Sequence, residues 1–122
     1  MEKLLERLKE IDFDTMDIDE LLDNRDCKPF DAEWNRIYKE ICKFKKEKEL
    51  TADQKKYSGW VSEKAFMTVY DLSRHGELAG YVSDDFSLMT DCKLMGFSDE
   101  WLTKLIGCYQ NGVIPSGELS EM

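Results

Sequence analysis

The sequence predicts a compact all-α domain, a bundle of five or six helices. Apolar residues recur at steps of three and four, capping residues precede several of these runs, and only two prolines interrupt the 122 residues. No stretch alternates apolar and polar residues for long enough to predict a sheet. At this length we expect a single helical domain over residues 1–112, followed by an irregular tail over residues 113–122.

Apolar residues at helical spacing predict the first three helices. A leucine-rich face predicts a helix over residues 2–11. A second helix is expected over residues 15–23, because Asp17 and Asp19 then lie in its first turn, where the helix dipole favours acids. The third helix follows Pro29, and its apolar positions are Phe30, Trp34, Ile37, Ile41 and Phe44.

A capping box predicts the start of the fourth helix. Thr51 and Gln54 stand three residues apart, so each side chain can bond the backbone N–H of the other residue. An apolar stripe from Tyr57 to Leu72 follows. We expect Gly76 to end this helix in a left-handed cap.

Capping and stop residues also predict the C-terminal helices. Residues 77–82 fit either a short helix or an extended connector. Ser83 is expected to cap a fifth helix and Ser98 a sixth. The fifth helix should end at Gly96 and the sixth at Gly112.

The net charge of −9 excludes several classes of function. Proteins that bind nucleic-acid phosphates or anionic membranes need a basic face. No stretch approaches the roughly 20 apolar residues of a membrane span, and the charged N-terminus carries no secretory signal. The four cysteines form no C-x-x-C pair and are typical of reduced thiols. We therefore expect a soluble, cytoplasmic protein that contacts neither nucleic acid nor membrane.

Candidate catalytic residues are few. His75 is the single histidine, and near a helix end we expect it to have a structural role. No nucleophile elbow and no phosphate-binding glycine loop occurs. The adjacent acids Asp84 and Asp85 point to different sides of a helix, which does not suit an acid–base pair. The tryptophans are spaced as core or partly buried residues. We expect no enzyme and no cofactor.

Metal ligands do not gather in the sequence. Zinc sites usually take their ligands in close pairs, whereas the nearest cysteines, Cys27 and Cys42, lie fifteen residues apart. The acidic run over residues 12–20 invites comparison with an EF-hand loop, but its fifth and sixth positions would be Met16 and Asp17. A calcium ligand and a glycine are needed there, so we expect no bound metal.

Charge is distributed unevenly along the chain. Residues 1–26 carry a net charge of −6, residues 27–56 of +3, and residues 57–122 of −6. Ordinary solubility accounts for such a surface without any partner. The other interpretation is a surface that binds a strongly basic protein, because complementary fields speed association and select the partner.

Residues 76–86 read GELAGYVSDDF. Together with the small size, the acidity and the helical content, this segment resembles small cytosolic immunity proteins of bacteria, as in contact-dependent growth inhibition and polymorphic toxin systems. The resemblance implies a non-enzymatic inhibitor that forms a heterodimer with one cognate toxin domain. Such a toxin is often a basic nuclease, for example a tRNase, whose active site the inhibitor covers. The resemblance also leaves room for an additional host cytosolic protein in the toxin complex.

Two acidic clusters with aromatic neighbours are the candidate partner-binding residues. An inhibitor that covers a basic cleft gains by offering carboxylates and a few aromatic anchors. The first cluster consists of Phe13, Asp14, Asp17, Asp19, Glu20 and Asp23, and the second of Tyr81, Asp84 and Asp85. Several of these acids are also expected in the first turn of a helix, where a favourable interaction with the helix dipole would explain them without any partner.

Two other functions stay open. An acidic nucleic-acid mimic or adaptor would occupy a basic surface on another cytosolic protein. A small regulatory or structural domain would carry its charge incidentally. Genomic context separates the first of these from an immunity protein, because an immunity gene lies directly downstream of the gene for its toxin.

Overall fold

The computed structural model describes residues 1–119, and over that range it contains six α-helices and no strand. The all-α prediction is therefore confirmed. The helices are α1 (Glu2–Leu8), α2 (Ile18–Asp26), α3 (Phe30–Glu47), α4 (Ala52–Ser73), α5 (Gly76–Leu94) and α6 (Glu100–Gln110). Residues 120–122, the end of the expected tail, lie outside the described residues. Within residues 1–119 no helix is both long and apolar enough to cross a bilayer.

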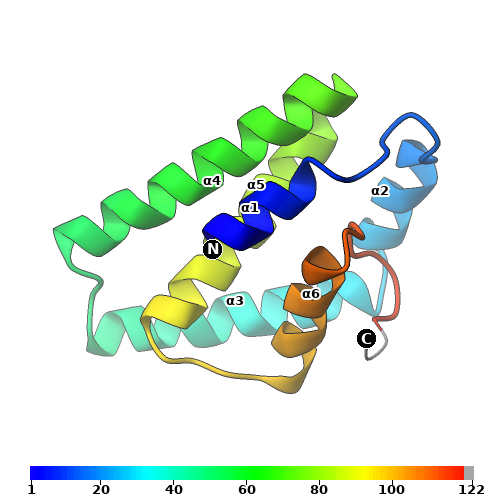
Figure 1. Ribbon diagram of the computed structural model, residues 1–122. Helices are drawn as coiled ribbons and strands as arrows, with labels where there is room; N and C mark the ends of the chain where they lie inside the picture. The colour runs from blue at the N-terminus through cyan, green and yellow to red at the C-terminus, as the bar shows by residue number, and fades with distance from the viewer. Residues whose placement is uncertain (120–122) are drawn as a thin grey trace.

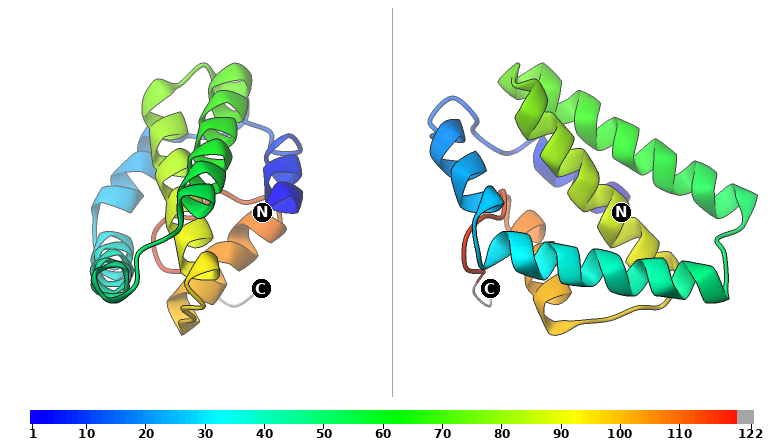
Figure 2. Two further views of the ribbon diagram at one scale, coloured as in Figure 1. Left: turned by 90° about the vertical axis from the view of Figure 1, so that its left-hand side faces the viewer. Right: turned by 180° about the vertical axis from the view of Figure 1, so that it is seen from behind.

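The two longest helices, α4 and α5, form an antiparallel pair with the most extensive contact between any two helices (Figure 1). The short helix α1 packs against α4 and α6. On the other side, α3 runs across one end of α5, and α2 packs against α3 (Figure 2). The middle of α5 is thus enclosed by helices from both halves of the chain.

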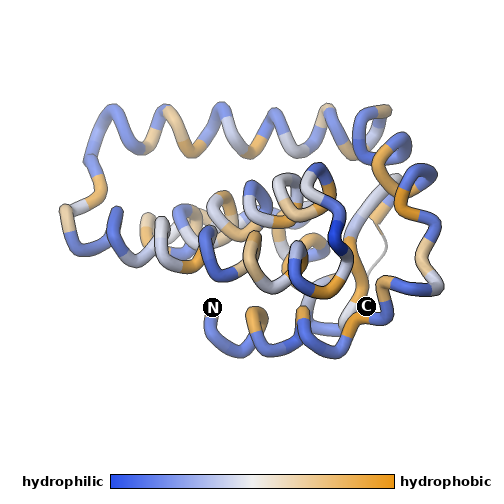
Figure 3. The backbone as a smooth tube through the Cα atoms, turned by 90° about the horizontal axis from the view of Figure 1, so that it is seen from above, coloured by the Kyte–Doolittle hydropathy of each residue, from blue (hydrophilic) through white to orange (hydrophobic). Residues whose placement is uncertain are grey.

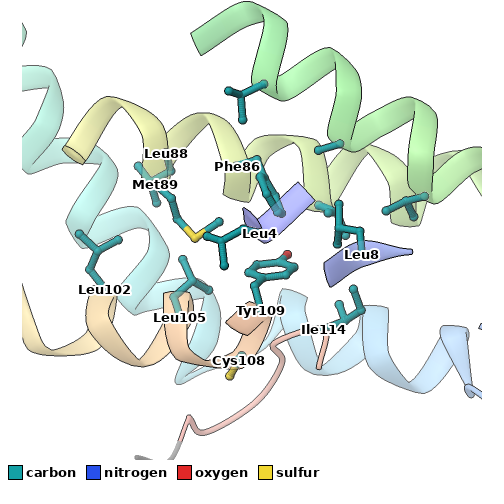
Figure 4. Packing of buried hydrophobic residues seen from close by; sticks show 14 of the residues in the cluster. Leu4, Leu8, Phe86, Leu88, Met89, Leu102, Leu105, Cys108, Tyr109 and Ile114 are labelled. Carbon is teal, nitrogen blue, oxygen red and sulfur yellow. The ribbon is translucent and has the colours of Figure 1, made fainter. Parts of the chain in front are cut away.

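The core forms where α1, α5 and α6 meet. Figure 4 shows Leu4 and Leu8 of α1 beside Phe86 and Tyr109. The rings of Phe86 and Tyr109 meet edge to face with their centroids 4.9 Å apart, a favoured aromatic geometry. Along every helix, apolar segments alternate with hydrophilic ones (Figure 3), as expected for helices that bury one face.

The segment after α6 also contributes to the core. Gly112 has a φ of +71°, a left-handed conformation that glycine adopts without strain, and it turns the chain back toward the helices. Ile114 and Leu119 are then buried, at 4% and 8% exposure. Residues 113–119 contain no helix or strand, but these two side chains hold them against the bundle.

The observed ends of α1, α2 and α4 agree only in part with the bounds predicted from the sequence. The capping box of Thr51 and Gln54 at the start of α4 is confirmed. Asp17 caps α2, so this helix begins at residue 18 and not at residue 15. The helix α1 ends at Leu8, before the predicted Ile11, because the next three residues bond to carbonyls only three positions back.

The prediction that Gly76 ends the fourth helix is wrong. Arg74 adopts the left-handed conformation, with a φ of +58°, and ends α4 two residues earlier. His75 then caps α5, because its Nδ1 accepts a hydrogen bond from the backbone N–H of Leu78 at 3.2 Å. Gly76 is the first residue of α5.

As a consequence, residues 77–82 are helical, and Ser83 lies inside α5 and does not cap it. The Ser83 hydroxyl donates to the backbone carbonyl of Ser62 on α4 at 3.1 Å, so it joins the two long helices. The cap of α6 also differs, because Asp99 and not Ser98 accepts the backbone N–H groups of Trp101 and Leu102.

The glycines predicted to end the fifth and sixth helices are found where expected, whereas the three tryptophans differ in burial. Gly96 and Gly112, both with positive φ, follow α5 and α6 as predicted. Trp101 is buried and Trp34 is half-buried. Trp60 lies at the surface of α4 with 42% of its area exposed.

Candidate functional site

A buried ion pair lies at the centre of the candidate site. Arg25 of α2 donates from its two Nη atoms to the two carboxylate oxygens of Asp85 on α5, at 2.8 and 2.6 Å. The side chains are 2% and 0% exposed. Bidentate pairs of this kind fix the orientation of both groups, because both N–H···O bonds must be satisfied at once.

The Asp85 carboxylate accepts two further hydrogen bonds. Trp34 of α3 donates its Nε1–H at 3.0 Å, and Tyr109 of α6 donates its hydroxyl at 2.5 Å. Burial, together with the nearby Asp85 charge, raises the pKa of Tyr109 well above its ordinary value, so the hydroxyl stays protonated and donates. Arg25 also donates to the backbone carbonyl of Pro115 at 3.0 Å. The network thus joins four helices and the C-terminal segment.

Two aromatic rings cover the guanidinium group of Arg25. Its Cζ lies 4.4 Å from the ring centroid of Phe30 and 5.1 Å from that of Tyr81, within the range of cation–π contacts. Its buried Nε is the one buried side-chain nitrogen or oxygen in residues 1–119 without a hydrogen-bond partner. The two rings and the ion pair therefore fix the position of the Arg25 side chain, which forms the floor of a cavity.

Above this floor opens a cavity of about 170 Å³ between α2, α3 and α5, which we call the acidic pocket. Because a water molecule takes about 30 Å³ in the liquid, the pocket has room for the head group of a side chain. Its walls combine aromatic rings, carboxylates and an amide: Arg25, Asp26, Phe30, Asp31, Trp34, Asn35, Tyr81 and Asp84.

The rim of the acidic pocket carries uncompensated negative charge. Arg25 is neutralised by Asp85, whereas Asp31 and Asp84 make no hydrogen bond or ion pair through their side chains to any other residue of the range 1–119. Burial and the Asp85 charge raise the pKa of Asp84. Asp26 accepts the hydroxyl of Tyr81, and this hydrogen bond raises the pKa of Tyr81 to about 12. An incoming cation would relieve the repulsion among these carboxylates.

A stripe of acids leads along α2 to this rim. Asp19, Asp23 and Asp26 are spaced by four and three residues, so they share one face of the helix, and all three are exposed. We call Asp19, Asp23, Asp26, Asp31 and Asp84 together the acidic face. The structure places Tyr81 and Asp84 of the second predicted cluster next to Asp26, at the end of the helix that carries Asp19 and Asp23 of the first cluster.

The remaining predicted residues are placed differently. Asp14 and Glu20 are exposed near the start of α2. Asp17 caps this helix, because its carboxylate accepts a hydrogen bond from the backbone N–H of Glu20. Phe13 is only 6% exposed and belongs to the hydrophobic core. Asp85 is fully buried in the ion pair and does not reach the surface of residues 1–119.

Six of the eight residues that line the acidic pocket were not predicted as site residues: Arg25, Asp26, Phe30, Asp31, Trp34 and Asn35. Asp26 and Asp31 fell outside the acidic runs, and Arg25 and Trp34 were assigned to no cluster. A signal was present for one of them, because Arg25 is the single base between residues 10 and 27. A lone base within an acidic segment is a candidate for a buried ion pair.

The metal-binding and nucleophilic side chains of residues 1–119 are scattered or buried. Residues 1–119 contain no group of three or more histidines, cysteines or acids that could hold a metal ion. All four cysteines are free, and Cys92 and Cys108 are buried. Burial raises the pKa of Cys92 to about 12, which keeps its thiol protonated. His75 is used as a helix cap.

Half-buried tyrosine and tryptophan beside exposed carboxylates, as around the acidic pocket, are features of protein-binding surfaces. The family comparison agrees with a protein-binding function. The chain belongs to the family Immunity protein PIM1, whose model matches residues 2–116. The search of curated proteins finds no match. Family membership makes toxin neutralisation the function of this chain and a cognate toxin its partner.

Proposed function

We propose that this immunity protein neutralises its toxin by non-covalent binding through the acidic face and without catalysis of its own. The toxin domain is a basic one, such as a nuclease, and the acidic face covers its active-site cleft. The complex is a heterodimer that forms in the cytoplasm of a cell exposed to the toxin of its neighbours. The observation that carries this proposal is the set of unpaired carboxylates around the acidic pocket.

Electrostatics favours a basic partner. A nuclease must hold an anionic substrate, so lysine and arginine line its cleft. Asp31 and Asp84 have no ion pair to break before they meet such a cleft, and Asp19 and Asp23 extend the same field along α2. Complementary charge of this kind raises the association rate, which suits an inhibitor that must act before the toxin does.

The aromatic walls supply the apolar part of the contact. Trp34 and Tyr81 are half-buried, with one part held by hydrogen bonds and the other open to the pocket. Tyrosine and tryptophan are enriched among residues that dominate binding energy, because they bury a large area at a low cost in entropy. A lysine or arginine of the toxin would find both rings and carboxylates there.

Charge reversal and charge removal on the acidic face test the proposal. We would compare Asp19→Lys/Asp23→Lys, and separately Asp31→Asn/Asp84→Asn, with the parent in titrations against the cognate toxin at two salt concentrations. The control is Glu47→Lys/Glu49→Lys, which makes the same charge change as the first variant and a larger one than the second, at exposed sites at and just after the end of α3. Circular dichroism establishes that each variant is folded.

The expected result is slower association and a smaller salt dependence for both acidic-face variants, and unchanged binding for the control. Cells that carry the acidic-face variants should lose protection from the toxin. If all three folded variants bind and protect like the parent, toxin binding does not use the acidic face.

A further inference from the structure

The side of α3 that forms one wall of the acidic pocket continues along the helix beyond the pocket. The helix lies at the edge of the bundle, where it packs mainly against α2 and α5 (Figure 2). Asp31 and Asn35 belong to the pocket wall. Tyr38, Cys42 and Lys46 follow at steps of three, four and four residues, so they lie on the same side of α3. This side therefore extends the surface around the pocket toward the C-terminal end of the helix.

Two stacked rings join the pocket to this extension. Trp34 in the pocket wall and Tyr38, one turn further along α3, have their ring centroids 5.6 Å apart and an interplanar angle of 17°. Tyr38 is 48% exposed. It lines a shallow groove of about 350 Å³, which we call the α3 groove and to which Lys39, Cys42 and Lys46 also contribute. The two rings thus form one aromatic surface between the acidic pocket and the α3 groove.

The α3 groove is basic, whereas the pocket is acidic. Of the seven residues that line the groove, four are bases and one is an acid. Two of the bases, Arg36 and Lys43, form ion pairs with acids of the same chain. The other two, Lys39 and Lys46, are exposed and make no ion pair or side-chain hydrogen bond within residues 1–119. Their charges are therefore available to another molecule.

The helix dipole does not account for both lysines. Bases are favoured in the last turn of a helix, and Lys46 lies there. Lys39 lies eight residues before the end of α3, which is more than two turns, and the effect of the dipole falls off within the last turn. Lys39 is thus an exposed, unpaired base in the middle of a helix whose same side begins with an acid of the pocket rim.

We propose that the α3 groove binds an acidic segment of the same toxin domain whose basic cleft the acidic face covers. This inference rests on the proposed function. A standard interface takes in roughly 20–30 residues of each partner, whereas eight line the acidic pocket, so the toxin covers more than the pocket. Lys39 lies about 12 Å along the helix from Asp31, well within such an interface. The toxin then carries bases opposite Asp31 and acids opposite Lys39 and Lys46.

Opposite charges on one surface select the partner and its orientation. A purely acidic surface attracts basic proteins in general, because their fields are complementary. An acidic pocket and a basic groove on one side of α3 accept only a partner that carries both charges in the matching order, since the reversed orientation places like charges together. The α3 groove therefore distinguishes the cognate toxin from other basic proteins.

Charge reversal in the groove separates this inference from simple attraction of a basic toxin. The variants are Lys39→Glu and Lys39→Glu/Lys46→Glu. The matched control is Lys56→Glu/Lys64→Glu, which makes the same charge change as the double variant at exposed sites of α4. If only the net charge matters, each of these variants binds a basic toxin faster than the parent does, because each is more acidic. An acidic toxin segment in the groove gives an effect of the opposite sign.

Each variant is titrated with the purified toxin domain that is encoded directly upstream of the gene for this chain, and circular dichroism establishes that it is folded. Lys39→Glu/Lys46→Glu should raise Kd about tenfold or more, and the control should leave Kd unchanged or lower it. Lys39→Glu should raise Kd by a smaller factor. Because this single variant leaves the last turn of α3 intact, it tests the groove even if the double variant does not fold.

The variant Asp31→Asn/Asp84→Asn, measured beside them, separates failure of this inference from failure of the proposed function. Weaker binding of this variant and of the groove variants supports the inference. If this variant binds weakly while the groove variants bind like the control, the proposed function stands and the α3 groove is not part of the interface. If it binds like the parent, the toxin does not use the acidic pocket, and both proposals are overturned.

Discussion

Asp85 and Arg25 lie 60 residues apart in the sequence and form a bidentate ion pair that water does not reach. Because Trp34 and Tyr109 donate to the same carboxylate, this single group joins α2, α3, α5 and α6. The walls of the acidic pocket are thus held in place by a charge that is itself fully buried.

Removal of the Asp85 charge should destabilise the fold strongly. In Asp85→Asn the side chain keeps its shape, but the buried Arg25 is left without a counter-charge. Breaking a buried pair in this way costs about 3–5 kcal/mol. The measurement is the free energy of unfolding in urea.

The neighbouring residue provides the control. Asp84→Asn changes an exposed carboxylate without a hydrogen-bond or ion-pair partner in residues 1–119, so its effect should stay within about 0.5 kcal/mol. Equal stability of the two variants would show that the Arg25–Asp85 pair does not hold the fold.

Stability should depend on the charge of Asp99 at low pH. Arg36 donates to both oxygens of this carboxylate, at 2.9 and 3.0 Å, and these hydrogen bonds lower the pKa of Asp99. Since the unfolded value is about 3.9, the pair stabilises the fold above that pH. The stabilisation is lost as the pH falls through the lower, folded pKa.

Asp99→Asn isolates this effect, because asparagine caps a helix as well as aspartate does. The stability difference between the parent and Asp99→Asn should be largest at about pH 6 and should shrink toward about pH 3. Urea titrations at several pH values measure it. A difference that stays constant with pH would refute the role of the Asp99 charge.

The four thiols should react at different rates with an alkylating reagent. Cys27 is exposed, whereas burial raises the pKa of both Cys92 and Cys108 and shields them. Since the thiolate is the nucleophile, Cys27 should be labelled first and the two buried thiols only after unfolding. Mass spectrometry of the labelled protein, native and in denaturant, counts the adducts. Rapid labelling of Cys92 in the native protein would contradict its burial.

The segment after α6 should matter for stability although it has no regular structure. Ile114 is 4% exposed, and its replacement by alanine should cost about 2–5 kcal/mol. Its neighbour Val113 is 43% exposed, so Val113→Ala should change stability by less than about 0.5 kcal/mol. Thermal unfolding of the two variants compares them directly. Similar melting temperatures would mean that this segment does not belong to the folded unit.

Local signals were sufficient for most of the helices. The capping box at Thr51 and the glycines Gly96 and Gly112 depend on contacts within a few residues, and each is found where the sequence predicts it. Ser83, followed by two acids, carries the same local signal as a helix start. It lies inside α5 because helical packing against α4 continues through it.

The candidate site could be predicted only in part, because its centre depends on distant contacts. Asp84 and Asp85 are neighbours of the same chemistry, and no local pattern separates the exposed one from the buried one. The difference arises from Arg25, which meets Asp85 from another helix. Asp19, Glu20 and Asp23 of α2 were found from the density of acids in the sequence, whereas Asp26, at the end of the same helix, was not.

The acidic pocket combines a buried ion pair, Arg25–Asp85, with exposed carboxylates at its rim, and these two parts tolerate substitution differently during evolution. The side chains of Asp31 and Asp84 make no hydrogen bond or ion pair within residues 1–119, so we expect their replacement to alter the pocket opening at little cost in stability. Asp85 permits no such exchange, because Arg25 would lose its counter-charge. Under the proposed function, a few substitutions at the rim would adapt the inhibitor to a diverged toxin while the framework that folds the protein is inherited intact.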